Sequence, residues 1–127
     1  NKNIEVKKSP LHGYGVFAKE KIKKNEIIEE CFYLVQPTIH PYNADYLYRW
    51  PQKGDFKYNV LALGFGSIYN SSKTSNERGV EWQTDEENNI FIYRSVKTIE
   101  KDEEILTYYG EKWWNHHNQK YLPKNIE

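Results

Sequence analysis

The sequence is poor in cysteine, because Cys31 is the only one among its 127 residues. A single thiol cannot form an internal disulfide and cannot anchor a cysteine-rich zinc site. Long hydrophobic runs are also missing: no stretch approaches the ~20 apolar residues of a membrane span. The opening residues, NKNIEVKKSP, lack the apolar core of a signal peptide. These absences predict a soluble intracellular domain with no membrane partner.

The chain has no excess of either charge, since 18 Lys and Arg residues balance 18 Asp and Glu residues. Broad binding to nucleic acid depends on neutralising phosphates, so we expect no direct nucleic-acid partner. Aromatic residues are plentiful, at 16% of the chain, and include 11 Tyr and 4 Trp. Much of the core should therefore consist of rings that carry a hydrogen-bonding group. The length predicts a single domain, residues 1–127.

Local patterns predict many short strands and little helix. The segments with strand character are residues 3–8, 14–19, 27–36, 89–99 and 104–109. Residues 100–104, EKDEE, are expected to turn the fourth of these segments back onto the fifth as a hairpin. Residues 42–50 are expected to form a short helix before Pro51. The predicted fold class is mainly β.

Familiar catalytic motifs are missing. The sequence contains no G-x-S-x-G elbow, no P-loop, no H-E-x-x-H and no G-x-G-x-x-G that opens a helix. Cys31 lies in an apolar strand rather than in an activating environment. His116 and His117 are adjacent, point in different directions and have no third ligand nearby, so we expect no metal site. Hydrolase, kinase and dinucleotide-dependent activities are poorly supported.

Two glycine-bracketed aromatic residues mark candidate ligand loops. In HGYGVFA, residues 12–18, the glycines allow a tight turn and the close approach of a ligand. In LGFGSIYNSS, residues 63–72, an apolar run ends abruptly at Asn70, whose side chain could bond a ligand. Taken singly, the first motif is more simply a β-turn. The second is equally compatible with the capped end of an element.

The acidic runs TDEEN (84–88) and EKDEE (100–104) are expected to be solvated turns. The alternative is that they line a groove for a basic peptide. Just after the second run, Tyr108 and Tyr109 precede Gly110. Successive side chains on a strand point to opposite faces, so one tyrosine can pack in a core while the other presents its hydroxyl. Gly110 lets the backbone turn sharply or lets a ligand come close.

The order and spacing of GYGVFA, GFGSIYNSS…N and EEILTYYG resemble a SET domain, the fold of S-adenosylmethionine-dependent protein-lysine methyltransferases. The resemblance extends from about Val6 to Trp114. It is strongest to small stand-alone viral and microbial SET proteins, which lack flanking zinc-binding modules. It implies small β-sheets of the β-clip kind, with segment 67–76 threaded beneath the C-terminal segment as a pseudoknot. It also implies S-adenosylmethionine as cofactor, S-adenosylhomocysteine as product and no metal.

The resemblance assigns roles position by position. Tyr109 matches the catalytic tyrosine of the family. The positions that match cofactor contacts are His12, Gly13, Tyr14, Gly15, Asn70, Ser71 and Trp114, with Asn76 at the place of a later Asn. The positions that match the channel for the substrate lysine are Tyr46, Thr107, Tyr109 and Trp113.

Three departures from the family pattern bear on function. Ser71 stands where His is usual, so the affinity for the cofactor could be weaker. Tyr108 replaces a common Asp or Ser. Thr107 stands where Phe or Tyr often limits the number of methyl groups added, and its smaller side chain favours di- or trimethylation.

Methyl transfer requires a neutral amine, and because free lysine has a pKa of about 10.4, deprotonation at pH 7.4 costs roughly 4 kcal/mol. A dry aromatic channel and a nearby sulfonium both lower that pKa. No residue is an obvious base. Tyr109 is therefore expected to position the reacting groups and to assist the transfer electrostatically, and the amine proton is expected to leave to water.

The sequence therefore predicts a methyltransferase acting on lysines of a histone or other basic protein. Its substrate should bind as an extended peptide along an edge strand. The expected compartment is the cytoplasm, or the nucleus of a eukaryotic host, and a homodimer is allowed. The alternatives are a SET-fold module that binds cofactor or peptide but is impaired in catalysis, and a β-rich structural domain.

Overall fold

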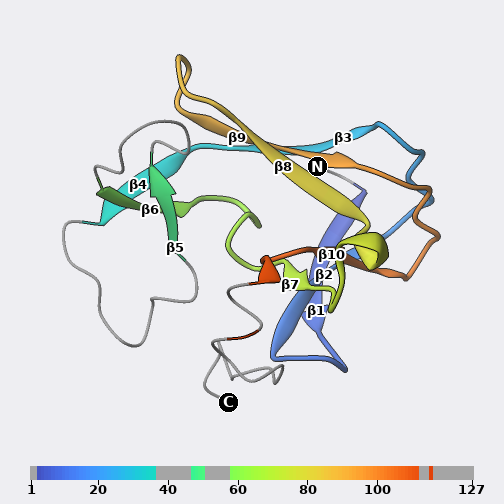
Figure 1. The fold of residues 1–127 in the computed structure, drawn as a ribbon. Coiled ribbons are helices and arrows are strands. Elements are labelled where there is room, and N and C mark those ends of the chain that lie inside the picture. The colour runs from blue at the N-terminus through green and yellow to red at the C-terminus, as the bar shows by residue number, and fades with distance from the viewer. Residues whose placement is uncertain (1–2, 37–46, 51–57, 112–114, 116–127) are drawn as a thin grey trace.

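The computed structural model describes residues 3–36, 47–50, 58–111 and 115, and consists mainly of strands in three small sheets (Figure 1). The first sheet has the order β1 (Ile4–Lys8), β2 (Tyr14–Ala18), β10 (Glu104–Thr107) and β7 (Asn70–Ser71). The second has the order β3 (Ile27–Cys31), β9 (Ile90–Ser95) and β8 (Val80–Asp85). The third has the order β4 (Tyr33–Gln36), β6 (Tyr58–Ala62) and β5 (Leu47–Trp50). The predicted mainly β fold is confirmed.

The first hairpin agrees with the sequence prediction. Strands β1 and β2 pair antiparallel with Val6 opposite Val16. Gly13 takes a positive φ of 48° in the turn between them, which a residue with a side chain adopts at a cost. This turn holds the HGYG motif at one end of the first sheet.

The predicted helix over 42–50 is wrong for the part that the structure describes. Leu47–Trp50 is strand β5, which pairs antiparallel with β6. The ring of Trp50 packs 4.6 Å from that of Tyr33 and 5.2 Å from that of Phe91. Aromatic packing within the third sheet and against the second therefore decides the conformation here, over the local capping signals. Residues 42–46 lie outside the described residues.

The predicted hairpin of 89–99 with 104–109 is also wrong. Strand β9 pairs with β3 and β8, whereas β10 pairs with β2 and β7. Between them, the backbone of Ile99 bonds that of Ile22 in an isolated bridge, and both side chains are buried. This long-range contact fixes the path of the chain between β9 in the second sheet and β10 in the first. The predicted strand 27–36 likewise divides at Phe32 into β3 and β4, which belong to different sheets.

Strands β7 and β10 bring the middle and the end of the chain side by side (Figure 1). They pair in parallel, with Leu106 opposite Asn70 and Thr107 opposite Ser71. Beyond β7, the Ser72 N–H donates to the Thr107 carbonyl at 2.7 Å and the Gly79 N–H donates to the Leu106 carbonyl at 2.8 Å. The chain thus passes around β10, which is the crossing that the pseudoknot requires.

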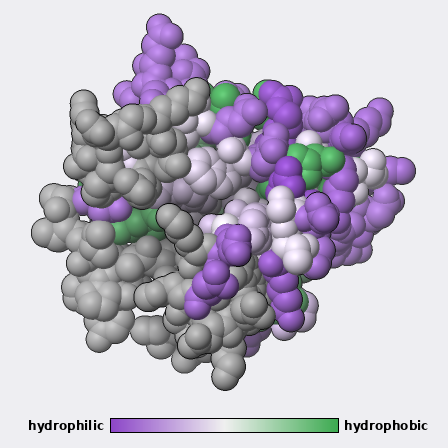
Figure 2. All heavy atoms as spheres, in the orientation of Figure 1, coloured by the Kyte–Doolittle hydropathy of each residue, from purple (hydrophilic) through white to green (hydrophobic). Residues whose placement is uncertain are grey.

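The core lies between the three sheets and contains aliphatic residues together with buried Tyr69, Tyr93 and Phe91. Both tyrosines are hydrogen-bonded, as expected for a core of rings with polar groups. The face drawn in Figure 2 is mainly hydrophilic over the described residues, with small hydrophobic areas. Within the described ranges, the chain has no helix with the length and apolar character needed to cross a membrane.

Candidate active site

Asn70 joins the three motifs that the sequence singles out. It is fully buried in β7. Its side-chain Nδ2 lies 2.9 Å from the His12 carbonyl, 3.1 Å from the Tyr14 carbonyl and 2.8 Å from Glu104 Oε2. Two amide hydrogens are therefore shared among three acceptors. The HGYG turn, the end of the second motif and the start of the last strand meet at this one side chain.

The prediction that the run 100–104 is a solvated turn is confirmed for the exposed residues 100–102 and is wrong for Glu104, which is half-buried in β10. Its carboxylate accepts from Asn70 through Oε2 and from the Ser9 hydroxyl through Oε1, at 2.7 Å. A Cβ at Gly15 would collide with Glu104 Oε2, so the chain needs glycine there to pack against this carboxylate. The periodicity of β10 could have indicated it, because Glu104 and Leu106 share a face while Ile105 and Thr107 are buried on the other.

The other polar atom of the Asn70 side chain is the oxygen Oδ1, which is a hydrogen-bond acceptor. Among the described residues, Asn70 Oδ1 is the buried side-chain oxygen that makes no hydrogen bond. A buried acceptor without a donor costs about 1–3 kcal/mol, so such atoms in native proteins call for an explanation. A ligand that carries an N–H donor, such as an ammonium group, would satisfy it.

Tyr109 is held at two points beside Asn70. Its hydroxyl donates to the Tyr69 carbonyl at 2.5 Å, and its backbone N–H donates to Ser71 Oγ at 3.0 Å. Ser71 Oγ in turn donates to the Ser72 carbonyl at 2.7 Å. The serine that departs from the family pattern therefore anchors the backbone of Tyr109, a role that sequence comparison could not reveal.

The adjacent tyrosine has a different environment, as the strand periodicity predicts. Tyr108 and buried Thr107 line a cavity of about 250 Å³, together with Ser75, Arg78, Glu81 and Trp82. After them, Gly110 has a φ of +104°, so the backbone makes the turn that favours glycine. Thr107 thus borders this cavity, whose lining includes Tyr108 and not Tyr109.

Tyr69 belongs to a cluster of tyrosines with Tyr48 and Tyr93, and the sequence pattern did not predict this cluster. Tyr69 stacks on Tyr93, with ring centroids 4.8 Å apart and planes at 21°. Tyr93 Oη lies 3.0 Å from Tyr48 Oη, and burial raises the pKa of Tyr48 to about 12. Burial also raises the pKa of Tyr69 and of Tyr93 well above the usual range. Burial, with the nearby Glu29 carboxylate, raises the pKa of the Cys31 thiol to about 12.

These raised pKa values predict that the folded protein loses stability as the pH rises above about 9. The unfolded chain would release protons from Cys31 and Tyr48 near pH 9 and 10, their ordinary values, while the folded chain keeps them until about pH 12. The unfolded state then binds fewer protons, so the free energy of unfolding falls with pH across this window. Urea unfolding midpoints between pH 7 and 11 would measure the fall. A Cys31→Ala, Tyr48→Phe variant should show a shallower decline, and equal slopes would contradict the assignment.

Several predicted residues lie outside the part of the chain that the structure describes. These are Tyr46, Trp113 and Trp114 of the predicted site, together with His116 and His117. Among the described residues, no group of three His, Cys, Asp or Glu side chains could hold a metal ion. The structure brings together His12, Gly13, Tyr14, Gly15, Asn70, Ser71 and Tyr109, while Thr107 borders the neighbouring cavity.

Comparison with known proteins agrees with this geometry. The family model described as the SET domain matches residues 13–110. The chain is 30% identical over 118 residues to a Schizosaccharomyces pombe histone-lysine N-methyltransferase specific for H3 lysine 37, covering 87% of this chain and 76% of the relative.

Solved structures show the same likeness. A Plasmodium falciparum protein described as a candidate histone methyltransferase is 40% identical, with a TM-score of 0.67 over 88% of this chain and 96% of that one. The methyltransferase domain of human PR domain-containing protein 2 shares the fold at 16% identity, with a TM-score of 0.62 over 87% of this chain and 80% of that one. The chain belongs to the SET-domain family, the family of protein-lysine methyltransferases.

Proposed function

We propose that this chain transfers methyl groups from S-adenosylmethionine to lysine side chains of a histone or a similarly basic protein. SET methyltransferases use S-adenosylmethionine, and the relatives above include histone-lysine methyltransferases. The observation that carries the proposal is the meeting of Asn70, the HGYG turn and Tyr109 at one place in the fold. Such a substrate would be met in the nucleus or the cytoplasm.

The residues around Asn70 fit a ligand with an amino-acid end. Asn70 Oδ1 is a buried acceptor that would receive a hydrogen bond from the ammonium group of S-adenosylmethionine. The turn of residues 12–15 is pinned beside it through the His12 and Tyr14 carbonyls. The cofactor supplies an electrophilic methyl group on a sulfonium sulfur. We assign cofactor binding to His12, Gly13, Tyr14, Gly15, Asn70 and Ser71, with Trp114 expected over the adenine.

Tyr109 would orient the reaction rather than remove the lysine proton. Its hydroxyl already donates to a carbonyl, and a phenol with a pKa near 10 is a poor base at neutral pH. A phenol oxygen can also accept a hydrogen bond from the amine and so help to align it, and alignment supplies a large share of the rate in such displacements. The amine proton leaves to water. The lysine would enter past Thr107, and Tyr46 and Trp113 are expected along the same channel.

Transfer of radiolabelled methyl groups to core histones tests the function directly. We expect label on lysine, located by mass spectrometry. We also expect calorimetry to detect the binding of S-adenosylmethionine. Cofactor binding without label on histones or on a cell lysate would instead favour a binding module. The absence of cofactor binding would contradict the proposal.

Thr107 gives a prediction about the product. Because Thr107 is small and stands where Phe or Tyr often limits methylation in the family, we expect wild type to produce di- and trimethyl-lysine. Thr107→Phe would place a bulky ring at this position and raise the share of monomethyl product, since room beside the amine limits further methylation. Mass spectra of a reacted histone peptide give the shares. Unchanged shares of mono-, di- and trimethyl product in a folded, active Thr107→Phe variant would show that Thr107 does not line the channel.

A further inference from the structure

Glu29 holds both ends of the segment that leads into β7. This half-buried carboxylate in β3 accepts from the Phe65 N–H through Oε2 and from the Tyr69 hydroxyl through Oε1, each at 2.8 Å. Gly64, just before the segment, has a φ of +67°, and a Cβ there would collide with Glu29 Oε2. The turn over residues 64–69 is therefore shaped around one carboxylate. Hydrogen bonds to a charged acceptor are among the stronger ones in proteins.

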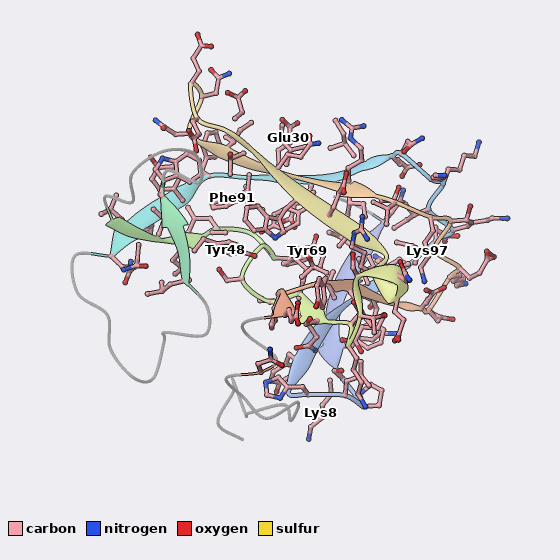
Figure 3. All side chains as sticks on the ribbon, in the orientation of Figure 1. Lys8, Glu30, Tyr48, Tyr69, Phe91 and Lys97 are labelled. Atoms are coloured by element: carbon pink, nitrogen blue, oxygen red, sulfur yellow. The ribbon has the colours of Figure 1, made fainter. Side chains whose placement is uncertain are left out.

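The tyrosine cluster of Tyr48, Tyr69 and Tyr93 contacts the same segment, and Tyr93 is the cross-strand partner of Glu29. The Gly66 carbonyl accepts from the Tyr48 hydroxyl at 2.8 Å and lies 3.0 Å from the Tyr93 hydroxyl. The Tyr69 ring packs flat on Tyr93. Figure 3 shows Tyr48 and Tyr69 in the interior of the molecule, while Glu30, the neighbour of Glu29, lies on the outer side of the second sheet.

This packing fixes the position of the Tyr69 carbonyl, which accepts a hydrogen bond from the Tyr109 hydroxyl. We propose that Glu29 and Tyr69 are positioning residues that set the orientation of the Tyr109 hydroxyl for methyl transfer. The inference rests on the proposed catalytic function of Tyr109. Glu29 accepts from the Tyr69 side chain, and the Tyr69 carbonyl accepts from the Tyr109 hydroxyl.

The geometry explains why such support is needed. The backbone of Tyr109 is fixed by Ser71 Oγ, but a phenol can still swing about its side-chain torsions. Its direction is then decided by the Tyr69 carbonyl. The peptide that carries this carbonyl is held on the Asn70 side by pairing with Leu106. On its other side, Tyr69 is held through its side chain by Glu29 and Tyr93.

The test compares Tyr69→Phe and Glu29→Gln with two matched controls. Tyr69→Phe keeps the stacking on Tyr93 and removes only the hydroxyl that binds Glu29. Because small misplacements of a reacting group are costly, we expect kcat to fall roughly tenfold with little change in the KM for peptide. Tyr33→Phe removes a tyrosine hydroxyl in the third sheet, where Tyr33 packs on Trp50, and Glu30→Gln changes the exposed neighbouring carboxylate; both should keep the wild-type kcat.

Repeating Tyr69→Phe in a Tyr109→Phe background distinguishes an action through the Tyr109 hydroxyl from a merely structural role of Tyr69. If Tyr69 acts through the Tyr109 hydroxyl, its loss has no further effect on kcat once that hydroxyl is gone, so the two changes are not additive. All assays are run below the unfolding temperature of each variant. Additive losses, or an unchanged kcat in Tyr69→Phe, would overturn the proposal.

A second measurement does not depend on turnover. The ring Cζ resonance of Tyr109, assigned with Tyr109→Phe, reports the hydrogen bond of its hydroxyl. We expect it to move in Tyr69→Phe and Glu29→Gln and to stay in Glu30→Gln. An unmoved resonance would overturn the positioning role even in an active enzyme. Absence of methyl transfer by wild type, with the resonance moving as expected, would count against the proposed function and leave the positioning intact.

Discussion

Tyr109→Phe should lower the rate of methyl transfer by roughly 100-fold, the usual effect of removing one well-placed polar group from a reacting centre. The change removes the hydroxyl that donates to the Tyr69 carbonyl. It leaves the backbone anchor intact, because Ser71 Oγ binds the N–H of Tyr109 and not its side chain. We therefore expect kcat to fall while cofactor affinity stays near that of wild type.

Single-turnover assays with a histone peptide, beside calorimetric titration with the cofactor, measure the two effects separately. Tyr33→Phe is the matched control, because Tyr33 packs on Trp50 in the third sheet, away from the Asn70 cluster. It should retain full activity. A Tyr109→Phe variant that methylates at the wild-type rate would remove Tyr109 from the reaction. A variant that loses the cofactor as well would make its role structural.

Asn70→Asp should destabilise the folded protein by about 3 kcal/mol, the cost of replacing a buried donor with an unpaired charge. The amide that bonds two carbonyls and a carboxylate would become a carboxylate facing all three. Repulsion from Glu104 and burial would raise the pKa of the introduced carboxyl group. The loss of stability should therefore shrink as the pH is lowered toward about 5.

Urea unfolding measures this change, and two further variants define its cause. In Asn70→Asp with Glu104→Gln, the glutamine amide can donate to the new carboxylate, so part of the stability should return. Asn88→Asp makes the same chemical change in the exposed β8–β9 turn, where Asn88 bonds Asp85, and should cost less than about 0.5 kcal/mol. An Asn70→Asp protein as stable as wild type would show that the three motifs do not depend on this amide.

The sequence by itself determined the features that depend on local order. Residues 3–8 and 14–19 alternate or carry β-branched side chains around a Gly-containing turn, and they form β1 and β2 as predicted. Asn70 at the end of an apolar run, and two tyrosines before Gly110, were sufficient to select the residues that meet in the fold. Spacing along the chain made the family resemblance visible, since each motif occupies a turn or strand end whose chemistry is local.

Only the tertiary structure decided which strands pair and which side chains hold the site together. Leu47–Trp50 became a strand because its rings pack against Tyr33 and Phe91, which no local pattern contains. Glu104 and Glu29 look like ordinary surface carboxylates in the sequence. Glu104 binds Asn70, 34 residues away, and Glu29 binds Tyr69, 40 residues away. Contacts over such separations depend on the complete fold, because loop closure and packing bring the partners together and local preference does not.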